Sequence, residues 1–179
     1  MGSSGKSTLA KRIKQTFGHN WVEVDALRAF YDGVTPEDKI FHQPDWLQAK
    51  MMRDGMTEYI RETECATNNH QEYFVFEGVA LDVRSLLEVL DEGKYVFICM
   101  AYQQISAGDK LAEIKKFERK NDWTTEYSDE EKLAMIETKI KESKIVKERA
   151  EKYGLKYFDT SRDRDAVLDE IIEFLRGQL

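Results

Sequence analysis

Two hydrophobic patterns alternate along this chain. Apolar residues spaced three and four positions apart predict helices over residues 5–17, 26–31, 45–65, 83–90, 105–120, 129–153 and 164–176. Short, uninterrupted apolar runs predict strands over residues 21–24, 73–76, 94–100 and 155–158. Continuous apolar strands are typical of parallel sheets that are covered on both faces. The alternation therefore predicts an α/β fold with a doubly wound sheet.

Several helix ends carry their own signals. Gly18 and Gly154 follow predicted helices and suit helix stops. Ser128 and Glu131 have the spacing of a capping box, which places a helix start between them. The closing helix should turn one apolar stripe inward, made of Val167, Leu168, Ile171, Ile172 and Leu175. A chain of 179 residues fits one domain with a sizeable core, and we expect a single domain over residues 1–179.

Composition narrows the classes of function. Hydrophobic residues make up 41% of the chain and charged residues 34%, with a formal net charge of −7. This acidic, globular composition disfavours a general nucleic-acid binder. No apolar run approaches the roughly 18 residues of a membrane span, so we expect no membrane partner. Cys65 and Cys99 lie far apart and predict free thiols in a reducing, cytoplasmic setting. The oligomeric state stays open.

The letters GKST at residues 5–8 open the first predicted helix. They match the end of the phosphate-binding pattern G-x-x-x-x-G-K-[ST], in which backbone N–H groups and a helix N-terminus converge on phosphate. Lys6 would reach the β- and γ-phosphates of ATP, and the Ser7 hydroxyl would hold Mg²⁺. The nucleotide would also contact the rest of the loop and helix start, namely Ser3, Ser4, Gly5 and Thr8. The alternative is an expression scar, MGSSG, in front of an ordinary basic helix.

Asp25 follows the apolar strand WVEV. The carboxyl ends of strands line the ligand crevice of an open parallel sheet, so Asp25 could accept a proton from a substrate hydroxyl that attacks the γ-phosphate. The alternative is that Asp25 only caps the next helix. Arg28, one turn on, would face the same crevice and hold an anionic or hydroxylated substrate, or else be solvated surface.

Glu77 ends the apolar strand YFVF and precedes Gly78. A carboxylate in this position is placed to line the substrate site and to bind Mg²⁺ or its waters. Gly78 would let the chain turn close to the ligand. The alternative for a glutamate at a strand end is an ordinary surface residue.

A cationic cluster stands between two charged helices and comprises Lys115, Lys116, Arg119 and Lys120. Arg149 lies on the following helix. Arginines on a pair of helices over the γ-phosphate would form a lid that neutralises transition-state charge and excludes water. We expect this lid over about residues 105–150, with Arg119 as its catalytic arginine. The alternative is a solvated face with ion pairs along the helices.

Taken in order, these residues resemble the P-loop kinases of small molecules, which include shikimate, gluconate, nucleoside-monophosphate, 2-phosphoglycerate, zeta-toxin and chloramphenicol kinases. The resemblance spans the chain, but GKST is its one specific motif. It implies a three-layer fold with a five-stranded parallel sheet of order 2-3-1-4-5, helices on both faces, ATP and Mg²⁺ as ligands, and a mobile lid. It also implies that the loop containing Ser161 and Arg162 lies by the adenine.

The chain departs from this pattern at its start. The apolar first strand and the first glycine of the phosphate-binding pattern are absent, so an intact protein should have about 5–10 more residues upstream, by typical strand length. The sequence favours an ATP-dependent phosphotransferase acting on a small molecule. One alternative is a nucleoside-monophosphate kinase, in which Arg28, Arg53 and Arg61 would grip the substrate phosphate. Another is a nucleotide-binding protein without catalytic activity.

Overall fold

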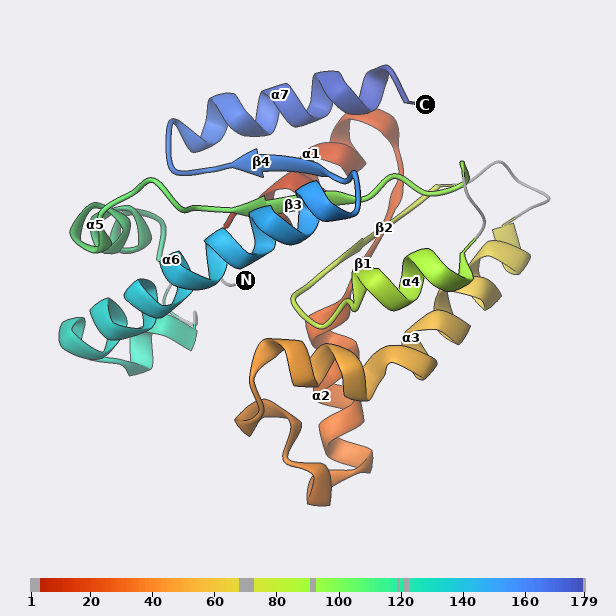
Figure 1. Ribbon diagram of the computed structural model, residues 1–179, viewed down its shortest axis with the longest axis horizontal. Coiled ribbons are helices and arrows are strands. Elements are labelled where there is room, and N and C mark those ends of the chain that lie inside the picture. The colour runs from red at the N-terminus through yellow and green to blue at the C-terminus, as the bar shows by residue number, and fades with distance from the viewer. Residues whose placement is uncertain (1–3, 68–72, 91–92, 119, 121–122, 179) are drawn as a thin grey trace. The chain divides into compact units, whose positions relative to one another are not determined.

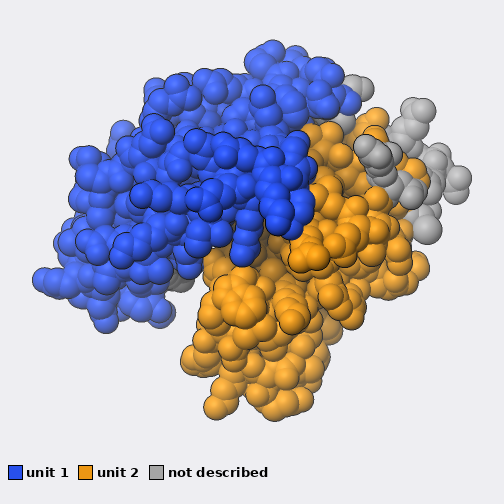
Figure 2. Space-filling view, viewed as in Figure 1, with its two compact units in different colours: residues 1–5, 98–179 blue, residues 6–97 orange. Residues whose placement is uncertain are grey.

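The described part of the chain divides into two compact units (Figure 2). The computed structural model describes residues 4–67, 73–90, 93–118, 120 and 123–178. Unit 1 contains Ser4, Gly5 and the chain from Ile98 onward, and unit 2 contains the chain from Lys6 to Phe97. The single domain expected from the sequence stays a prediction.

Unit 2 holds the N-terminal helices and the first pair of strands (Figure 1). Its elements are α1 (Lys6–Phe17), β1 (Asn20–Glu23), α2 (Val24–Val34), the 3₁₀ turns η1 (Pro36–Asp38) and η2 (Ile40–His42), α3 (Asp45–Thr67), β2 (Phe74–Glu77) and α4 (Val83–Val89). Strands β1 and β2 pair in parallel, so that Glu23 stands opposite Glu77 at their carboxyl ends. Helix α1 packs against both strands.

The hydrophobic core of unit 2 joins α2, η2, α3 and α4. Its buried members are Val24, Ile40, Met52, Met56, Ile60, Ala80 and Leu86. The spacing of Met52, Met56 and Ile60 places them on one stripe of α3, as the sequence periodicity requires. Trp46 and Tyr59, two aromatic residues of the same helix, are instead 60% and 41% exposed. Only part of the apolar surface of α3 is therefore buried in this core.

Unit 1 contains the second pair of strands and the long charged helices. Its elements are β3 (Ile98–Ala101), α5 (Ala107–Phe117), η3 (Trp123–Glu126), α6 (Asp129–Lys152), β4 (Lys156–Asp159) and α7 (Arg164–Arg176). Strands β3 and β4 pair in parallel, with α7 along β4 on one side in Figure 1 and α6 on the other. All five apolar residues predicted to face inward from α7 are buried, which confirms that prediction. The capping box of Ser128 and Glu131 is confirmed as well.

One predicted strand is much shorter in the structure. Residues 94–97 lie outside β3, which begins at Ile98. The Lys94 ammonium and the Tyr95 hydroxyl both bind the Glu64 carboxylate on α3, at 2.7 and 2.6 Å. The Tyr95 and Phe97 rings pack against the core of unit 2. These contacts with a distant helix override the local preference of the apolar run for a strand.

The fold class is α/β, rich in helix, with two small parallel sheets of two strands each in the described residues. This bears out the coarse prediction of parallel strands alternating with helices. Among the described residues, no helix combines the length and the apolar character needed to cross a membrane.

A close backbone approach positions the start of α2 against the end of β2. A Cβ atom built on Gly78 would lie 2.7 Å from the Cβ of Val24, which is fully buried. It would also lie 3.5 Å from the Asp25 carboxylate. Only glycine therefore lets the turn after Glu77 pass this close to α2.

We expect Gly78→Ala to destabilise the protein by about 1–3 kcal/mol, as overpacking of a filled core does. Chemical denaturation measures this change. Gly55→Ala is the matched control, because Gly55 is inside α3 and a Cβ there meets nothing within 4 Å. It should stabilise the protein by about 0.5–1 kcal/mol through helix propensity. Equal effects of the two substitutions would contradict the steric account of Gly78.

Candidate functional site

A hydrogen bond joins the start of α1 to the end of β2. The Ser7 hydroxyl donates to a carboxylate oxygen of Glu77 at 2.9 Å, across 70 positions of sequence. Glu77 is only 8% exposed, so the alternative of an ordinary surface glutamate is wrong. The two residues that the sequence predicts to bind a metal ion are therefore in contact.

Lys6 brings positive charge to the same place. Burial lowers the pKa of the Lys6 ammonium, and the charges of Glu77, Asp25 and Asp45 act in the opposite direction. Burial raises the pKa of Glu77, while the Ser7 hydrogen bond and the Lys6 charge partly oppose that rise. The Lys6 charge thus lies among three carboxylates of unit 2.

Asp25 lies in the first turn of α2 rather than after the end of the strand. The N-cap of this helix is Glu23, and Val24 is the first helical residue, so the helix-cap alternative for Asp25 is wrong. The Oδ1 atom of Asp25 is buried and has no hydrogen-bond partner among the described residues. It lies 3.6 Å from a guanidinium nitrogen of Arg28. In the part of the chain that the structure describes, this carboxylate oxygen therefore accepts no hydrogen bond.

Arg28 is held in place by two neighbours in addition to Asp25. Its Nη1 atom donates to Gln48 Oε1 at 2.7 Å, and its guanidinium lies 4.7 Å from the centre of the Phe41 ring. The Gln48 amide nitrogen in turn donates to the Gln43 carbonyl at 2.6 Å. The Arg28 side chain is 16% exposed, so the solvated-surface alternative is wrong. Neighbouring groups fix the direction of the guanidinium.

The oxygen donors at Ser7 and Glu77 fit a magnesium ion. Mg²⁺ prefers oxygen ligands, and in phosphate-transfer sites it commonly takes one or two from the protein and the others from phosphates and water. Across the described residues, no cluster of three or more histidine, cysteine, aspartate or glutamate side chains has the arrangement of a metal site. The described residues therefore contain no metal site that is built from these protein side chains alone.

Other predicted nucleotide contacts belong to unit 1. Ser4 is fully buried, and Gly5 has a positive φ of 91°, which favours glycine. Ser161 accepts a hydrogen bond from the Gln104 backbone N–H at 2.8 Å, and Arg162 is exposed. Thr8, in unit 2, is exposed as well. Ser3 lies outside the described residues. The contacts of these residues with a nucleotide stay predictions.

The predicted lid remains a prediction. Arg119 lies outside the described residues. Lys115 forms an ion pair with Asp129, and Lys132 binds Glu118 at 2.9 Å, so part of the cationic cluster is already paired. Helix α6 also packs against β3 and β4. The segment 105–150 thus contributes to the packing of unit 1 in addition to any role as a lid.

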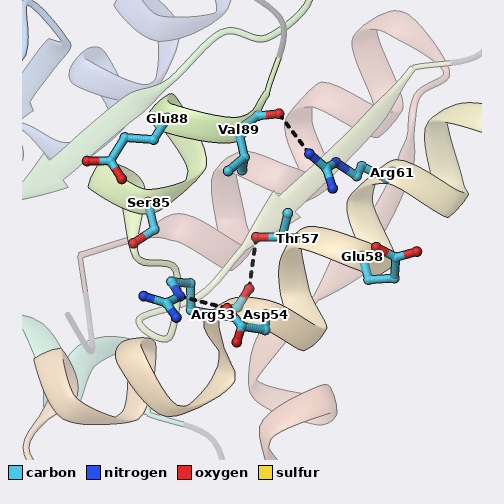
Figure 3. A pocket seen from close by; sticks show the side chains of 8 residues that line it. All are labelled: Arg53, Asp54, Thr57, Glu58, Arg61, Ser85, Glu88 and Val89. Atoms are coloured by element: carbon cyan, nitrogen blue, oxygen red, sulfur yellow. Dashed lines mark hydrogen bonds and ion pairs between the residues drawn. The ribbon is translucent and has the colours of Figure 1, made fainter.

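Arg53 and Arg61 lie in a groove between α3 and α4 (Figure 3). Arg53 binds the neighbouring Asp54 at 2.7 Å, and Arg61 donates to the Val89 carbonyl at 3.3 Å. Neither has a contact in common with Arg28, whose neighbours are Asp25, Phe41 and Gln48. The structure does not bring the three arginines of the monophosphate-kinase alternative together.

Sequence reasoning missed three residues of the site: Phe41, Asp45 and Gln48. They come from η2 and the first turn of α3. The start of α3 at Asp45 agrees with the helix predicted over residues 45–65. No local pattern indicated that this turn would face Arg28, because that contact depends on how α3 packs against α2.

A comparison of the sequence with protein-family models finds no match, and neither does a comparison with curated proteins.

We expect Ser7→Ala to raise the pKa of Glu77 further, because the hydroxyl hydrogen bond stabilises the ionised carboxylate. Carboxyl-detected NMR of the glutamates measures this shift. Ser85→Ala is the control, since its hydroxyl binds the separate carboxylate of Asp82. An unchanged Glu77 titration in Ser7→Ala would mean that the hydrogen bond does not form in solution.

The raised pKa of Glu77 makes the stability of the fold depend on pH. A pKa raised above the ordinary value of 4.5 means that the folded chain binds the proton more tightly than the unfolded chain. The contribution of Glu77 to stability is therefore full below pH 4.5 and falls as pH rises through the raised pKa.

Proposed function

We propose that this protein is an ATP-dependent phosphotransferase that moves the γ-phosphate of ATP to a hydroxyl group of a small molecule. The observation that carries the proposal is the Ser7–Glu77 hydrogen bond beside the Lys6 charge. A lysine and a hydroxyl at a helix start, next to an acid at a strand end, is the set of groups that binds phosphates and Mg²⁺ in P-loop sites.

The strand pairing supports the same proposal. In a sheet of order 2-3-1-4-5, strands 2 and 3 are neighbours, and so are strands 4 and 5. The observed parallel pairs, β1 with β2 and β3 with β4, are these two pairs in chain order. The five-stranded, three-layer sheet itself is part of the proposal.

In the proposed site, Lys6 and the N–H groups at the start of α1 bind the terminal phosphates of ATP. Ser7 and Glu77 hold Mg²⁺ through their oxygen atoms. When bound, Mg²⁺ neutralises charge on the phosphates. The low exposure of Glu77 excludes water from this carboxylate, which strengthens its interactions with cations.

Asp25 is the proposed base. The acceptor oxygen attacks the γ-phosphorus and forms a new P–O bond, while the bond between the γ-phosphorus and the oxygen that bridges it to the β-phosphate breaks. The hydroxyl proton passes to the Asp25 carboxylate, and ADP leaves. The Oδ1 atom of Asp25, which accepts no hydrogen bond from a described residue, is the acceptor that this step requires. Because phosphoryl transfer depends mainly on positioning, the carboxylate also aims the hydroxyl.

A nucleoside-monophosphate kinase is the weaker alternative, because Arg53 and Arg61 have partners in a groove apart from Arg28. A nucleotide-binding protein without activity remains an outcome of the experiments below. A panel of acceptors assayed for ADP release separates the three functions.

We expect Lys6→Ala to abolish the binding of Mg²⁺–ATP, because the ammonium is the charge that faces the phosphates in this proposal. Isothermal titration calorimetry with a non-hydrolysable ATP analogue measures the affinity. Lys11→Ala, on the same helix beside Trp21, is the control and should bind the analogue normally. Unchanged affinity in Lys6→Ala would remove the basis for a phosphate site at α1.

We expect Asp25→Asn to lower turnover by roughly 10²–10⁴, the range typical of positioned acid–base groups. The affinity for the ATP analogue should barely change, because Asp25 faces the acceptor. Asp32→Asn, farther along α2, is the matched control and should retain full turnover. Full activity in Asp25→Asn would exclude the role as base, while a loss confined to Asp25→Asn would exclude the inactive alternative.

A further inference from the structure

A cluster of three charged side chains in unit 1 has no part in the reaction proposed above. It joins Lys110 and Glu113 of α5 to Arg164, the first residue of α7. The Lys110 ammonium binds one oxygen of the Glu113 carboxylate at 2.9 Å, and a guanidinium nitrogen of Arg164 lies 3.4 Å from the other oxygen. One negative charge is therefore shared by two positive charges.

The cluster is shielded from water. The Lys110 side chain is only 1% exposed, and its ammonium lies 4.3 Å from the centre of the Tyr102 ring. The Arg164 guanidinium lies 4.1 Å from the centre of the Phe117 ring, and its Nε atom is buried without a hydrogen-bond partner among the described residues. Buried charges are screened much less than exposed ones. The field of this cluster therefore extends farther than that of a solvated helix face.

The two cations are close enough to affect each other. Burial lowers the pKa of the Lys110 ammonium, Glu113 acts in the opposite direction, and the charge of Arg164 lowers the pKa further. An arginine side chain stays charged in a protein. With Lys110 and Glu113 joined as an ion pair, the three side chains together carry one net positive charge.

The acidic residues on either side of Arg164 in the sequence do not cancel this charge. Asp163 and Asp165 are both exposed, so water screens their carboxylates. The Asp163 carboxylate also caps α7, because it accepts hydrogen bonds from the backbone N–H groups of Asp165 and Ala166. Within the part of the chain that the structure describes, the ion-pair partner of both cations is Glu113.

Arg164 brings this charge to the candidate phosphate loop. Gly5, the residue before Lys6, belongs to unit 1 and has the positive φ of a loop glycine. A Cβ atom built on Gly5 would lie 3.3 Å from the Cδ atom of Arg164, so the loop backbone packs tightly against this side chain. An anion bound at Gly5 would therefore lie near the net positive charge.

We propose that the cluster of Lys110, Glu113 and Arg164 strengthens the binding of nucleotide phosphates at the Gly5 loop through its net positive charge. This inference rests on the proposed function and adds to it an electrostatic contribution from three residues outside the phosphate-binding motif. A single charge at roughly 10 Å inside a protein is enough to change the affinity for an anion by about three- to tenfold.

The test alters the charge of the cluster and measures phosphate binding by calorimetry in the presence of Mg²⁺. Two probes are titrated separately: a non-hydrolysable ATP analogue, and inorganic tripolyphosphate, which lacks the base and the ribose. The variants are Arg164→Gln, Lys110→Met and the double variant Lys110→Met/Glu113→Gln. Arg176→Gln is the matched control, because it removes the same charge from an exposed position about 18 Å farther along α7. Chemical denaturation shows that each variant is folded.

We expect Arg164→Gln and Lys110→Met each to bind both probes about three- to tenfold more weakly than the wild type, because each variant leaves the cluster neutral. The double variant restores the net positive charge that Arg164 provides, so it should bind within about twofold of the wild type. Arg176→Gln should bind normally.

Unchanged affinity in Arg164→Gln and Lys110→Met would overturn the inference. So would a double variant that binds no better than Lys110→Met, because a cluster that only holds α5 against α7 would be weakened further by the second substitution. A loss seen with the ATP analogue but not with tripolyphosphate would also overturn it, since the effect would then not act on the phosphates. Failure of the proposed function looks different: the wild type would bind neither probe, and both conclusions would fall.

Discussion

Burial of the Glu77 carboxylate at the end of β2 is the constraint on which the candidate site depends. An ionised carboxylate with so little exposure is stable only when donors and positive charge surround it. Ser7 supplies the donor and Lys6 the charge, and this ties the start of α1 to the end of β2. Gly78, the next residue, leaves room for α2 to approach and so brings Asp25 to the same region.

Much of the fold was predictable wherever local signals decide the structure. Helix α7 spans the predicted residues, because one apolar stripe runs its full length. Ser128 begins α6 through hydrogen bonds to a residue three positions away, which a sequence pattern can encode. The failure at residues 94–97 has the opposite cause. Contacts with Glu64, thirty positions earlier in the chain, decide that segment, and no local pattern contains them.

About as much of the candidate site as of the fold could be predicted from the sequence. Lys6 and Ser7 follow from a motif, and Glu77 follows from the rule that strand ends line the ligand crevice of a parallel sheet. The helix-cap alternative for Asp25 could be excluded only with the structure, because α2 begins two residues before the predicted start and its cap is Glu23. Gln48 could not be found from the sequence, since its contact with Arg28 arises from the packing of two helices.

The buried amide of Gln48 affects the direction of the Arg28 guanidinium but not its charge. Glutamine and glutamate codons differ by a single base, and the two side chains have nearly the same shape. The point mutation Gln48→Glu would therefore change a site that attracts negative charge into an electrically balanced one. It would also remove the hydrogen bond to Gln43. In evolutionary terms, the charge of this group can change while the residues around it stay where they are.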